Sequence, residues 1–159
     1  MRAEMRTSLK NALRESVSMK KNKIILVGGC FDILHFGHIN FLREAKKHGD
    51  YLIVALESDE NVRRMKGDNR PIHTQVQRKQ MLKALEYVDE VRMLPPMKTD
   101  EDYNNLVLEI QPAVIAITEG DLIAHKKQKQ ANSVGAELVV IPKIHTPSTS
   151  QLAKLLNLD

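Results

Sequence analysis

Five short aliphatic runs, separated by segments with helical periodicity, limit the fold of this chain more than any other feature. The runs occupy residues 23–28, 51–57, 90–94, 113–118 and 137–141. Near-continuous apolar runs are typical of parallel strands buried on both faces. Strand and helix alternate along the chain, and such alternation is typical of right-handed crossovers. The pattern therefore predicts an α/β fold: a Rossmann-like open sheet of about five parallel strands with helices on both faces.

Capping residues indicate where the helices between these strands begin and end. We expect helices over 37–48, 75–87, 101–110, 122–133 and 149–157. Thr74 and Gln77 have the spacing of a capping box. Asp100 and Asp121 are candidate N-caps for the third and fourth helices, and Gly49 and Gly135 are candidate C-caps.

The basic charge of the chain is concentrated at its beginning. The net charge is +4, and residues 1–23 hold seven basic and two acidic side chains. The other 136 residues hold 17 basic and 18 acidic side chains and are near neutral. We therefore divide the chain into a basic arm (1–22), with apolar residues at helical spacing over 3–18, and one domain (23–159). The domain lacks the basic face and stacking aromatics of nucleic-acid binders, so nucleic acid is not the expected partner.

Length and composition exclude several classes of protein. A chain of 159 residues suits one domain, and its single cysteine, Cys30, excludes an internal disulfide framework. No apolar stretch approaches the ~20 residues that span a bilayer, and the N-terminus lacks the succession of a secretory signal. We expect a cytoplasmic protein with no membrane partner.

The end of the first predicted strand carries the residues most suggestive of chemistry. It reads Gly28-Gly29-Cys30-Phe31-Asp32 and leads into His35-Phe36-Gly37-His38 at the start of a helix. Ligands of open α/β sheets bind outside the carboxyl ends of the strands. Glycines permit close approach of a ligand, and a helix N-terminus favours an anion. Two imidazoles beside such a turn predict a phosphate pocket, although a metal site or a purely structural helix start is also compatible with paired histidines.

These residues resemble the signature of the HxGH nucleotidyltransferases, in their cytidylyltransferase-like branch. The similarity covers residues 23–157 and continues through Glu57-Ser58-Asp59, Met65-Lys66-Gly67, Arg70-Pro71-Ile72, Arg78 and Tyr87–Val91. The local pattern is similar to glycerol-3-phosphate cytidylyltransferase, the nucleotidyltransferase half of ADP-heptose synthase and archaeal-type FAD synthetase. The resemblance implies transfer of a nucleotidyl group from a nucleoside triphosphate, with Mg²⁺, to a phosphorylated small molecule, releasing pyrophosphate. It also implies a homodimer.

The resemblance assigns roles to individual residues. The implied catalytic residues are His35, His38, Lys66 and Arg78. The implied nucleotide-binding residues are Gly29, Cys30, Phe31, Gly37, His38, Gly120, Asp121, Ser148, Thr149 and Ser150. The implied acceptor-binding residues are Asp32, Lys66 and Arg78. No protein ligand for a metal is assigned.

Each of these roles has a plainer alternative. The basic residues Arg63, Arg64, Lys66 and Arg70 are equally compatible with a solvated loop after the second strand. Arg78 is compatible with an exposed helix arginine, and Asp32 with a turn residue or an outer-sphere metal partner. The hydroxyls at 148–150 are compatible with simple helix caps.

The chain departs from the resemblance at two positions, which leaves its substrates open. Leu122 stands where related enzymes carry an aromatic residue near the base, and Lys143 where cytidylyltransferases carry arginine. Heptose phosphate with ATP is the acceptor most similar in local pattern, followed by glycerol phosphate with CTP and FMN with ATP. A non-catalytic nucleotide-binding module is the alternative of a different class, and a fragment of a class I aminoacyl-tRNA synthetase is a third.

Overall fold

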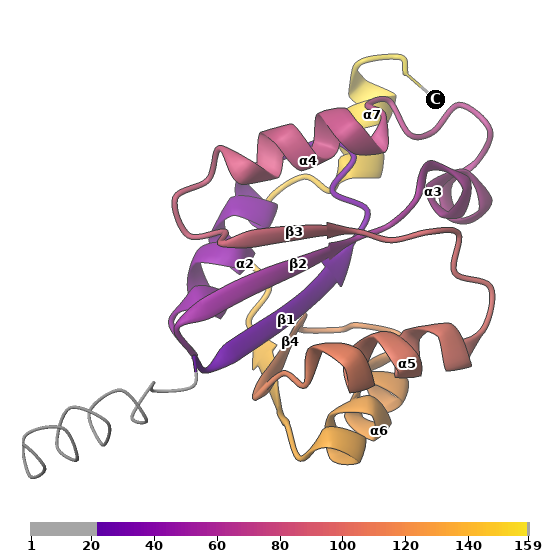
Figure 1. The fold of residues 1–159 in the computed structure, drawn as a ribbon. Helices are drawn as coiled ribbons and strands as arrows, with labels where there is room; N and C mark the ends of the chain where they lie inside the picture. Colours follow the sequence, from indigo (N-terminus) through magenta and orange to yellow (C-terminus); the bar gives the residue numbers. More distant parts are fainter. Residues whose placement is uncertain (1–21, 159) are drawn as a thin grey trace, which may run out of the picture.

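The computed structural model describes residues 22–158, which form a five-stranded parallel sheet with helices on both faces (Figure 1). The strands are β1 (Ile24–Gly29), β2 (Tyr51–Leu56), β3 (Glu90–Met93), β4 (Val114–Thr118) and β5 (Glu137–Ile141). The helices are α2 (Phe36–Lys46), α3 (Asp59–Lys66), α4 (Gln75–Lys83), α5 (Asp100–Ile110), α6 (Ala124–Val134) and α7 (Thr149–Leu155). The α/β fold, the parallel sheet and all five strands are therefore confirmed. The expected helical arm lies outside the described residues.

The strand order is β3-β2-β1-β4-β5, so the sheet grows outward from β1 in both directions. β1 pairs with β2 from Ile24 opposite Tyr51 to Gly29 opposite Leu56, and with β4 through Ile25 and Leu26. The chain order reverses between β1 and β4. In open α/β sheets a ligand binds outside the strand ends at this reversal.

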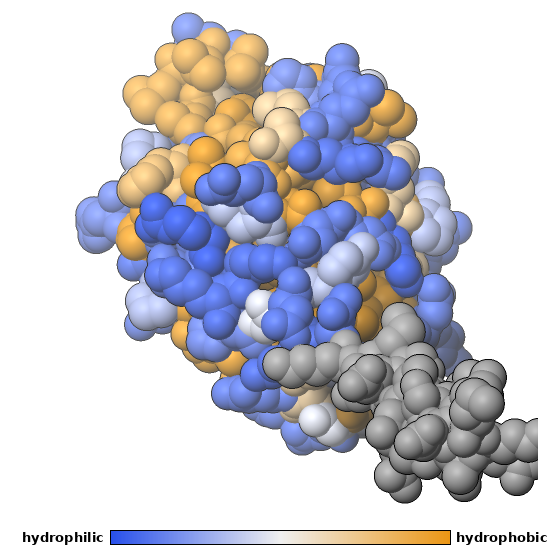
Figure 2. Space-filling model, turned by 60° about the vertical axis from the view of Figure 1, so that its left-hand side comes forward, coloured by the Kyte–Doolittle hydropathy of each residue, from blue (hydrophilic) through white to orange (hydrophobic). Residues whose placement is uncertain are grey.

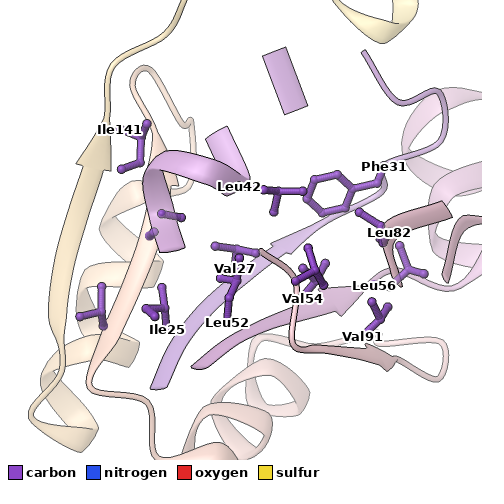
Figure 3. Packing of buried hydrophobic residues seen from close by; sticks show 14 residues of the cluster. Ile25, Val27, Phe31, Leu42, Leu52, Val54, Leu56, Leu82, Val91 and Ile141 are labelled. Carbon is purple, nitrogen blue, oxygen red and sulfur yellow. The ribbon is translucent and has the colours of Figure 1, made fainter. Parts of the chain in front are cut away.

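Two apolar layers cover the two faces of the sheet. On one face, Ile25, Val27 and Leu52 pack against Leu42 of α2 and Leu82 of α4 (Figure 3). On the opposite face, β-strand residues pack against α5 and α6 through a second cluster that includes Leu26, Ile53, Ile115, Leu106, Val107 and Ala131. Successive residues of each strand thus enter opposite layers, which explains why the strands read as continuous apolar runs.

Two of the five predicted helix caps are confirmed, and three differ. Thr74 and Gln77 form the expected capping box of α4, and Gly135 ends α6 with φ 68°. The N-cap of α5 is Thr99 rather than Asp100, because Thr99 forms a capping box with Asp102. Helix α2 ends at Lys46, before Gly49. Asp121 accepts a hydrogen bond from the Ile123 N–H but precedes α6, which begins at Ala124.

Hydrophilic residues predominate on the face shown in Figure 2, with an apolar area at its upper left end. In the part of the chain described, the most exposed large apolar side chains include Leu122, Leu155 and Leu156. No helix within residues 22–158 combines the length and apolarity that crossing a bilayer requires.

Replacement of Leu42 tests the packing that anchors α2 to the sheet. Leu42 is fully buried in the layer shown in Figure 3. We expect Leu42→Ala to lower the free energy of unfolding by about 2–5 kcal/mol, because it leaves a cavity. Leu108→Ala, at an exposed position of α5, is the matched control and should cost less than ~1 kcal/mol. Urea unfolding measures both; equal losses would contradict this packing.

Candidate active site

Three hollows surround the carboxyl ends of β1 and β4, where the strand order reverses. The first, of about 270 Å³, is lined by His35, His38, Lys66 and the N-terminus of α7, and is called the histidine pocket. The second, of about 160 Å³, lies along Gly28–Phe31 and reaches His38, and is called the glycine crevice. The third, of about 290 Å³, lies between the sheet and helices α5 and α6, and is called the α5–α6 pocket.

The start of α2 holds His35 in a defined orientation. His35 is the N-cap of this helix, and its Nδ1 accepts a hydrogen bond from the Gly37 N–H at 3.0 Å. A neutral imidazole that accepts at Nδ1 carries its proton on Nε2. His35 is thereby left with an N–H donor at the other side of its ring, beside a helix N-terminus that favours an anion.

His38 stacks on His35 and is kept neutral by its surroundings. The two ring centroids lie 3.9 Å apart with 30° between the planes, and the ring of Phe31 lies 5.1 Å from His38. Burial, followed by the neighbouring His35, lowers the pKa of His38 from 6.5 to about 4. Burial also lowers the pKa of His35. Both rings are therefore neutral hydrogen-bonding groups at pH 7.

Two glycines of the motif are required by close packing of the aromatic rings. A Cβ on Gly29 would lie 2.8 Å from the Phe31 ring, and a Cβ on Gly37 would lie 2.8 Å from both the His35 ring and Thr146 Cγ2. Phe31 itself has a φ of 44°, a left-handed conformation that bulky residues rarely adopt. Local strain is thus held where Phe31 meets His38, as is common at functional sites.

The opposite wall of the histidine pocket comes from residues distant in sequence. Ser148 caps α7 through a capping box with Gln151, so the cap interpretation is confirmed for this residue. Thr149 donates from Oγ1 to the Ile33 carbonyl at 3.3 Å, which joins α7 to the loop before α2. These residues, Ser150 and Lys66 face the same hollow as the two histidines. Two cations (Lys66 and Lys143), two imidazoles and two helix N-termini therefore surround a space suited to phosphates.

Arg78 and Asp32 are engaged within the protein rather than open to a ligand. Arg78 is fully buried, so the exposed-helix alternative is wrong. Its Nε donates to the His73 carbonyl at 3.1 Å, Nη1 to the Cys30 carbonyl, and Nη2 to the Glu57 carbonyl at 2.9 Å and to Asp59 Oδ1 at 2.8 Å.

The Asp32 carboxylate is equally occupied. It accepts from Arg70 Nε at 2.6 Å and from the backbone N–H groups of Ile72 and His73 at 2.8 and 3.1 Å. Asp32 is 1% exposed and therefore fixes the loop before α4 beneath the motif. In this geometry both Asp32 and Arg78 are buried and hold the strand ends through protein partners, and their predicted ligand roles stay predictions.

The four basic residues after β2 do not form one loop. Residues 59–66 form α3. Arg70, after this helix, is buried against Asp32, Arg64 donates to the Met97 carbonyl at 2.8 Å, and Arg63 is exposed. Lys66, the last residue of α3, reaches the histidine pocket. Capping by Ser58, which accepts from the Asn61 N–H at 3.1 Å, is the sequence signal for this helix.

Of the residues that follow β4, Asp121 lies at the glycine crevice, whereas Gly120 and Leu122 are exposed. Asp121 lines the glycine crevice and pairs with Lys127 at 2.7 Å. Burial alone would raise the pKa of Asp121, but Lys127 and the Ile123 N–H lower it below its ordinary value. Gly120 is exposed in a turn with φ 79°, and Leu122 is 94% exposed. Lys127 and Thr118 also line the glycine crevice and were not among the predicted site residues. The place of Thr118 at the end of β4 could have indicated it, whereas nothing in the sequence distinguishes Lys127 from the other lysines of α6.

Comparison with known proteins shows the family to which the chain belongs. A model of the cytidylyltransferase-like family matches residues 26–151. The chain belongs to this family of nucleotidyltransferases. It is 39% identical over 141 residues to the FAD synthase of Thermococcus kodakarensis, covering 86% of this chain and 92% of that protein. It is also 47% identical over 109 residues to the bifunctional protein HldE of Campylobacter fetus. This match covers 68% of this chain but only 22% of the HldE protein.

Solved structures share the fold. The lipopolysaccharide core biosynthesis protein of Thermoplasma volcanium superposes with a TM-score of 0.61 at 26% identity, over 79% of this chain and 99% of that one. A pantoate-beta-alanine ligase from Francisella tularensis superposes with a TM-score of 0.56 at 19% identity, over 86% and 64% of the two chains, and shows a shared fold only.

Replacement of Arg78 tests its role in holding this nucleotidyltransferase site together. Arg78→Met leaves the carbonyls of Cys30, Glu57 and His73 without their donor. An unsatisfied buried acceptor costs about 1–3 kcal/mol, so we expect a loss of at least ~3 kcal/mol in urea unfolding. The control, Lys83→Met at an exposed position of the same helix, should change stability by less than ~0.5 kcal/mol. A similar loss in both variants would contradict the assignment.

The lowered pKa of His38 predicts how stability depends on pH. Between pH 6.5 and about 4 the unfolded chain binds a proton at this residue and the folded chain does not. Stability should therefore decrease as the pH falls through this range, and His38→Gln should flatten the slope. Histidine NMR titration gives the pKa directly. A value near 6.5 in the free protein would show that the ring is not desolvated.

Proposed function

We propose that this nucleotidyltransferase moves a nucleoside monophosphate from ATP or CTP onto the phosphate of a small phosphorylated molecule. The observation that carries the proposal is the pair of neutral, stacked imidazoles at the α2 N-terminus, which share one hollow with Lys66 and the α7 N-terminus. An oxygen of the acceptor phosphate attacks the α-phosphorus, a new P–O bond forms, and the bond to the β-phosphate breaks. Pyrophosphate leaves with the electron pair of that bond.

The chemistry needs charge stabilisation and alignment more than a base. A phosphomonoester is already an anion near pH 7, so its oxygen is a ready nucleophile. His35 donates from Nε2 to the phosphate chain, and His38 donates beside it as negative charge moves to the leaving pyrophosphate. Lys66 supplies a fixed positive charge, and Ser148–Ser150 supply hydroxyl and backbone donors. Preorganised donors of this kind are the largest contribution to catalysis in many enzymes.

Mg²⁺ enters this scheme as part of the substrate, the Mg–nucleotide complex. Mg²⁺ prefers oxygen ligands and retains several waters, so phosphate oxygens suit it. The one carboxylate of the glycine motif, Asp32, already accepts three hydrogen bonds from the protein. The histidine pocket instead offers N–H, ammonium and hydroxyl groups, which bind the phosphates themselves. The cytoplasmic location and the homodimer remain predictions.

A second candidate is adenylyl transfer to FMN, which yields FAD. Similarity to the Thermococcus kodakarensis FAD synthase extends over nearly the full length of that protein, unlike the match to HldE. In this case the attacking oxygen belongs to the phosphate of FMN. The same pocket serves both reactions, and only the organic part of the acceptor differs.

The function is tested by pyrophosphate release with Mg²⁺, each nucleoside triphosphate and a panel of phosphomonoesters: heptose 1-phosphate, glycerol 3-phosphate and FMN. We expect release with one triphosphate and one acceptor. His38→Ala should lower kcat by about 10²–10³, the usual effect of removing one transition-state donor. His125→Ala, an exposed histidine on α6, is the matched control and should leave kcat unchanged.

Two outcomes would reject this proposal. Full activity in His38→Ala would exclude the imidazole mechanism. Binding of ATP or CTP, with no pyrophosphate released from the triphosphate in the presence of any acceptor, would favour a non-catalytic nucleotide-binding module.

A further inference from the structure

We propose that Asn61 and Tyr103 are positioning residues, which hold helix α3 so that Lys66, at the far end of that helix, meets the phosphates in the histidine pocket. The inference rests on the proposed nucleotidyl transfer and adds two residues to it. Neither Asn61 nor Tyr103 lines the histidine pocket, so their effect on the phosphates passes through Lys66, which does.

Burial is confined to the first turn of α3. The buried residues of this helix are Asn61 and Val62, whereas residues 63–69 are all exposed. Figure 1 shows α3 beyond the carboxyl ends of β1 and β2, at the side of the molecule. Lys66 is therefore carried at the exposed end of a helix whose packed end is the other one.

Three hydrogen bonds form a closed network that fixes this first turn. Asn61 Nδ2 donates to Glu57 Oε2 at 2.9 Å and to the Tyr103 hydroxyl at 3.2 Å. The same hydroxyl donates to Glu57 Oε1 at 2.9 Å. Burial, followed by the neighbouring Glu57 carboxylate, raises the pKa of Tyr103, so the hydroxyl keeps the proton that it donates. The network joins α3 to α5 and to the residue that follows β2.

Glu57 also sets the orientation of the Asn61 amide. Asn61 is fully buried, and its Oδ1 has no hydrogen-bond partner within residues 22–158. Exchange of the amide oxygen and nitrogen would turn Oδ1 toward the Glu57 carboxylate, which can only accept when ionised. Buried polar atoms almost always have partners. The amide is therefore held by the two bonds that its nitrogen donates, and removal of either bond loosens the turn.

A small tilt at this turn becomes a larger displacement at Lys66. Lys66 lies five residues beyond Asn61. That separation is ~7.5 Å along the helix axis, so a tilt of ~10° moves the end of α3 by ~1 Å. A displacement of ~1 Å in a site can lower a rate about 10²-fold.

A second bond limits the same tilt. Arg64 donates to the Met97 carbonyl at 2.8 Å, and Met97 lies in the loop before α5. The two connections of α3 thus reach α5 through Tyr103 and the preceding loop through Met97. The position of Lys66 over the histidine pocket is set from this side of the protein.

The experiment is a double-mutant cycle in the full chain, with inorganic pyrophosphate as the probe and titration calorimetry as the measurement. Lys66→Met should weaken pyrophosphate binding about tenfold, as expected for loss of a hydrogen bond to a charged group. Asn61→Ala and Tyr103→Phe should each weaken it about threefold in the wild-type chain but less than ~1.5-fold in Lys66→Met, because coupled residues are not additive. Where turnover is found, kcat should show the same coupling.

Two controls match these variants. Tyr87→Phe removes a hydroxyl from a part-buried ring on the opposite face of the sheet, and Asn105→Ala removes an amide from an exposed position of α5. Neither should change pyrophosphate binding. Tyr103→Phe keeps the ring that packs in the second apolar layer, so it tests the inference even where Asn61→Ala fails to fold. Thermal unfolding shows which variants are folded.

The outcomes separate this inference from the proposed function. Equal weakening by Tyr103→Phe with and without Lys66 would overturn it, because a purely structural role gives independent effects. Unchanged pyrophosphate binding in Tyr103→Phe, or in Lys66→Met, would also overturn it. Any of these results, together with turnover, leaves the nucleotidyltransferase in place. Coupled effects on pyrophosphate binding without turnover for any acceptor would reject the proposed transfer and retain the positioning of Lys66.

Discussion

The buried guanidinium of Arg78 is the interaction on which the rest of the site depends. One side chain joins the residue after β1, the residue after β2 and the loop before α4 through three backbone carbonyls. The planar donor fork of arginine can hold several fixed acceptors at once, which lysine cannot. A residue of α4 therefore fixes the ends of β1 and β2 relative to each other, and with them the glycine crevice.

The ligand-facing surface is built on this base. Asp32, held by Arg70 and two backbone N–H groups, supports the turn on which Phe31 adopts a left-handed conformation. Phe31 in turn packs on His38, and His38 stacks on His35. Desolvation lowers the pKa of both rings and keeps them neutral at pH 7, so in the proposed reaction they serve as hydrogen-bond donors beside Lys66. Structural roles and proposed chemical roles thus fall on different residues of one short motif.

Much of this arrangement could be predicted from the sequence, because its signals are local. Aliphatic runs marked all five strands, Thr74 and Gln77 marked the start of α4, and His35 to His38 marked the site. Prediction from the sequence was less successful where one local pattern fits more than one structure, such as a loop and a helix. The basic residues after β2 resemble a loop, yet a Ser58 cap begins a helix that contains three of them, while Arg70 follows the helix and is buried against Asp32. Thr99 caps α5 in place of Asp100, since a capping box requires the spacing to Asp102.

The sequence by itself determined the fold class, the family and the position of the paired-histidine motif, because each depends on the order and spacing of nearby residues. Tertiary structure decided what no local pattern contains. The strand order placed the reversal between β1 and β4, and with it three hollows around one pair of strand ends. Tertiary structure also decided that Arg78 and Asp32 are buried and bound to protein partners, which their positions in the sequence did not indicate. The α5–α6 pocket joins residues from three strands and three helices, and contacts between such distant segments are fixed only when the sheet and its covering helices pack.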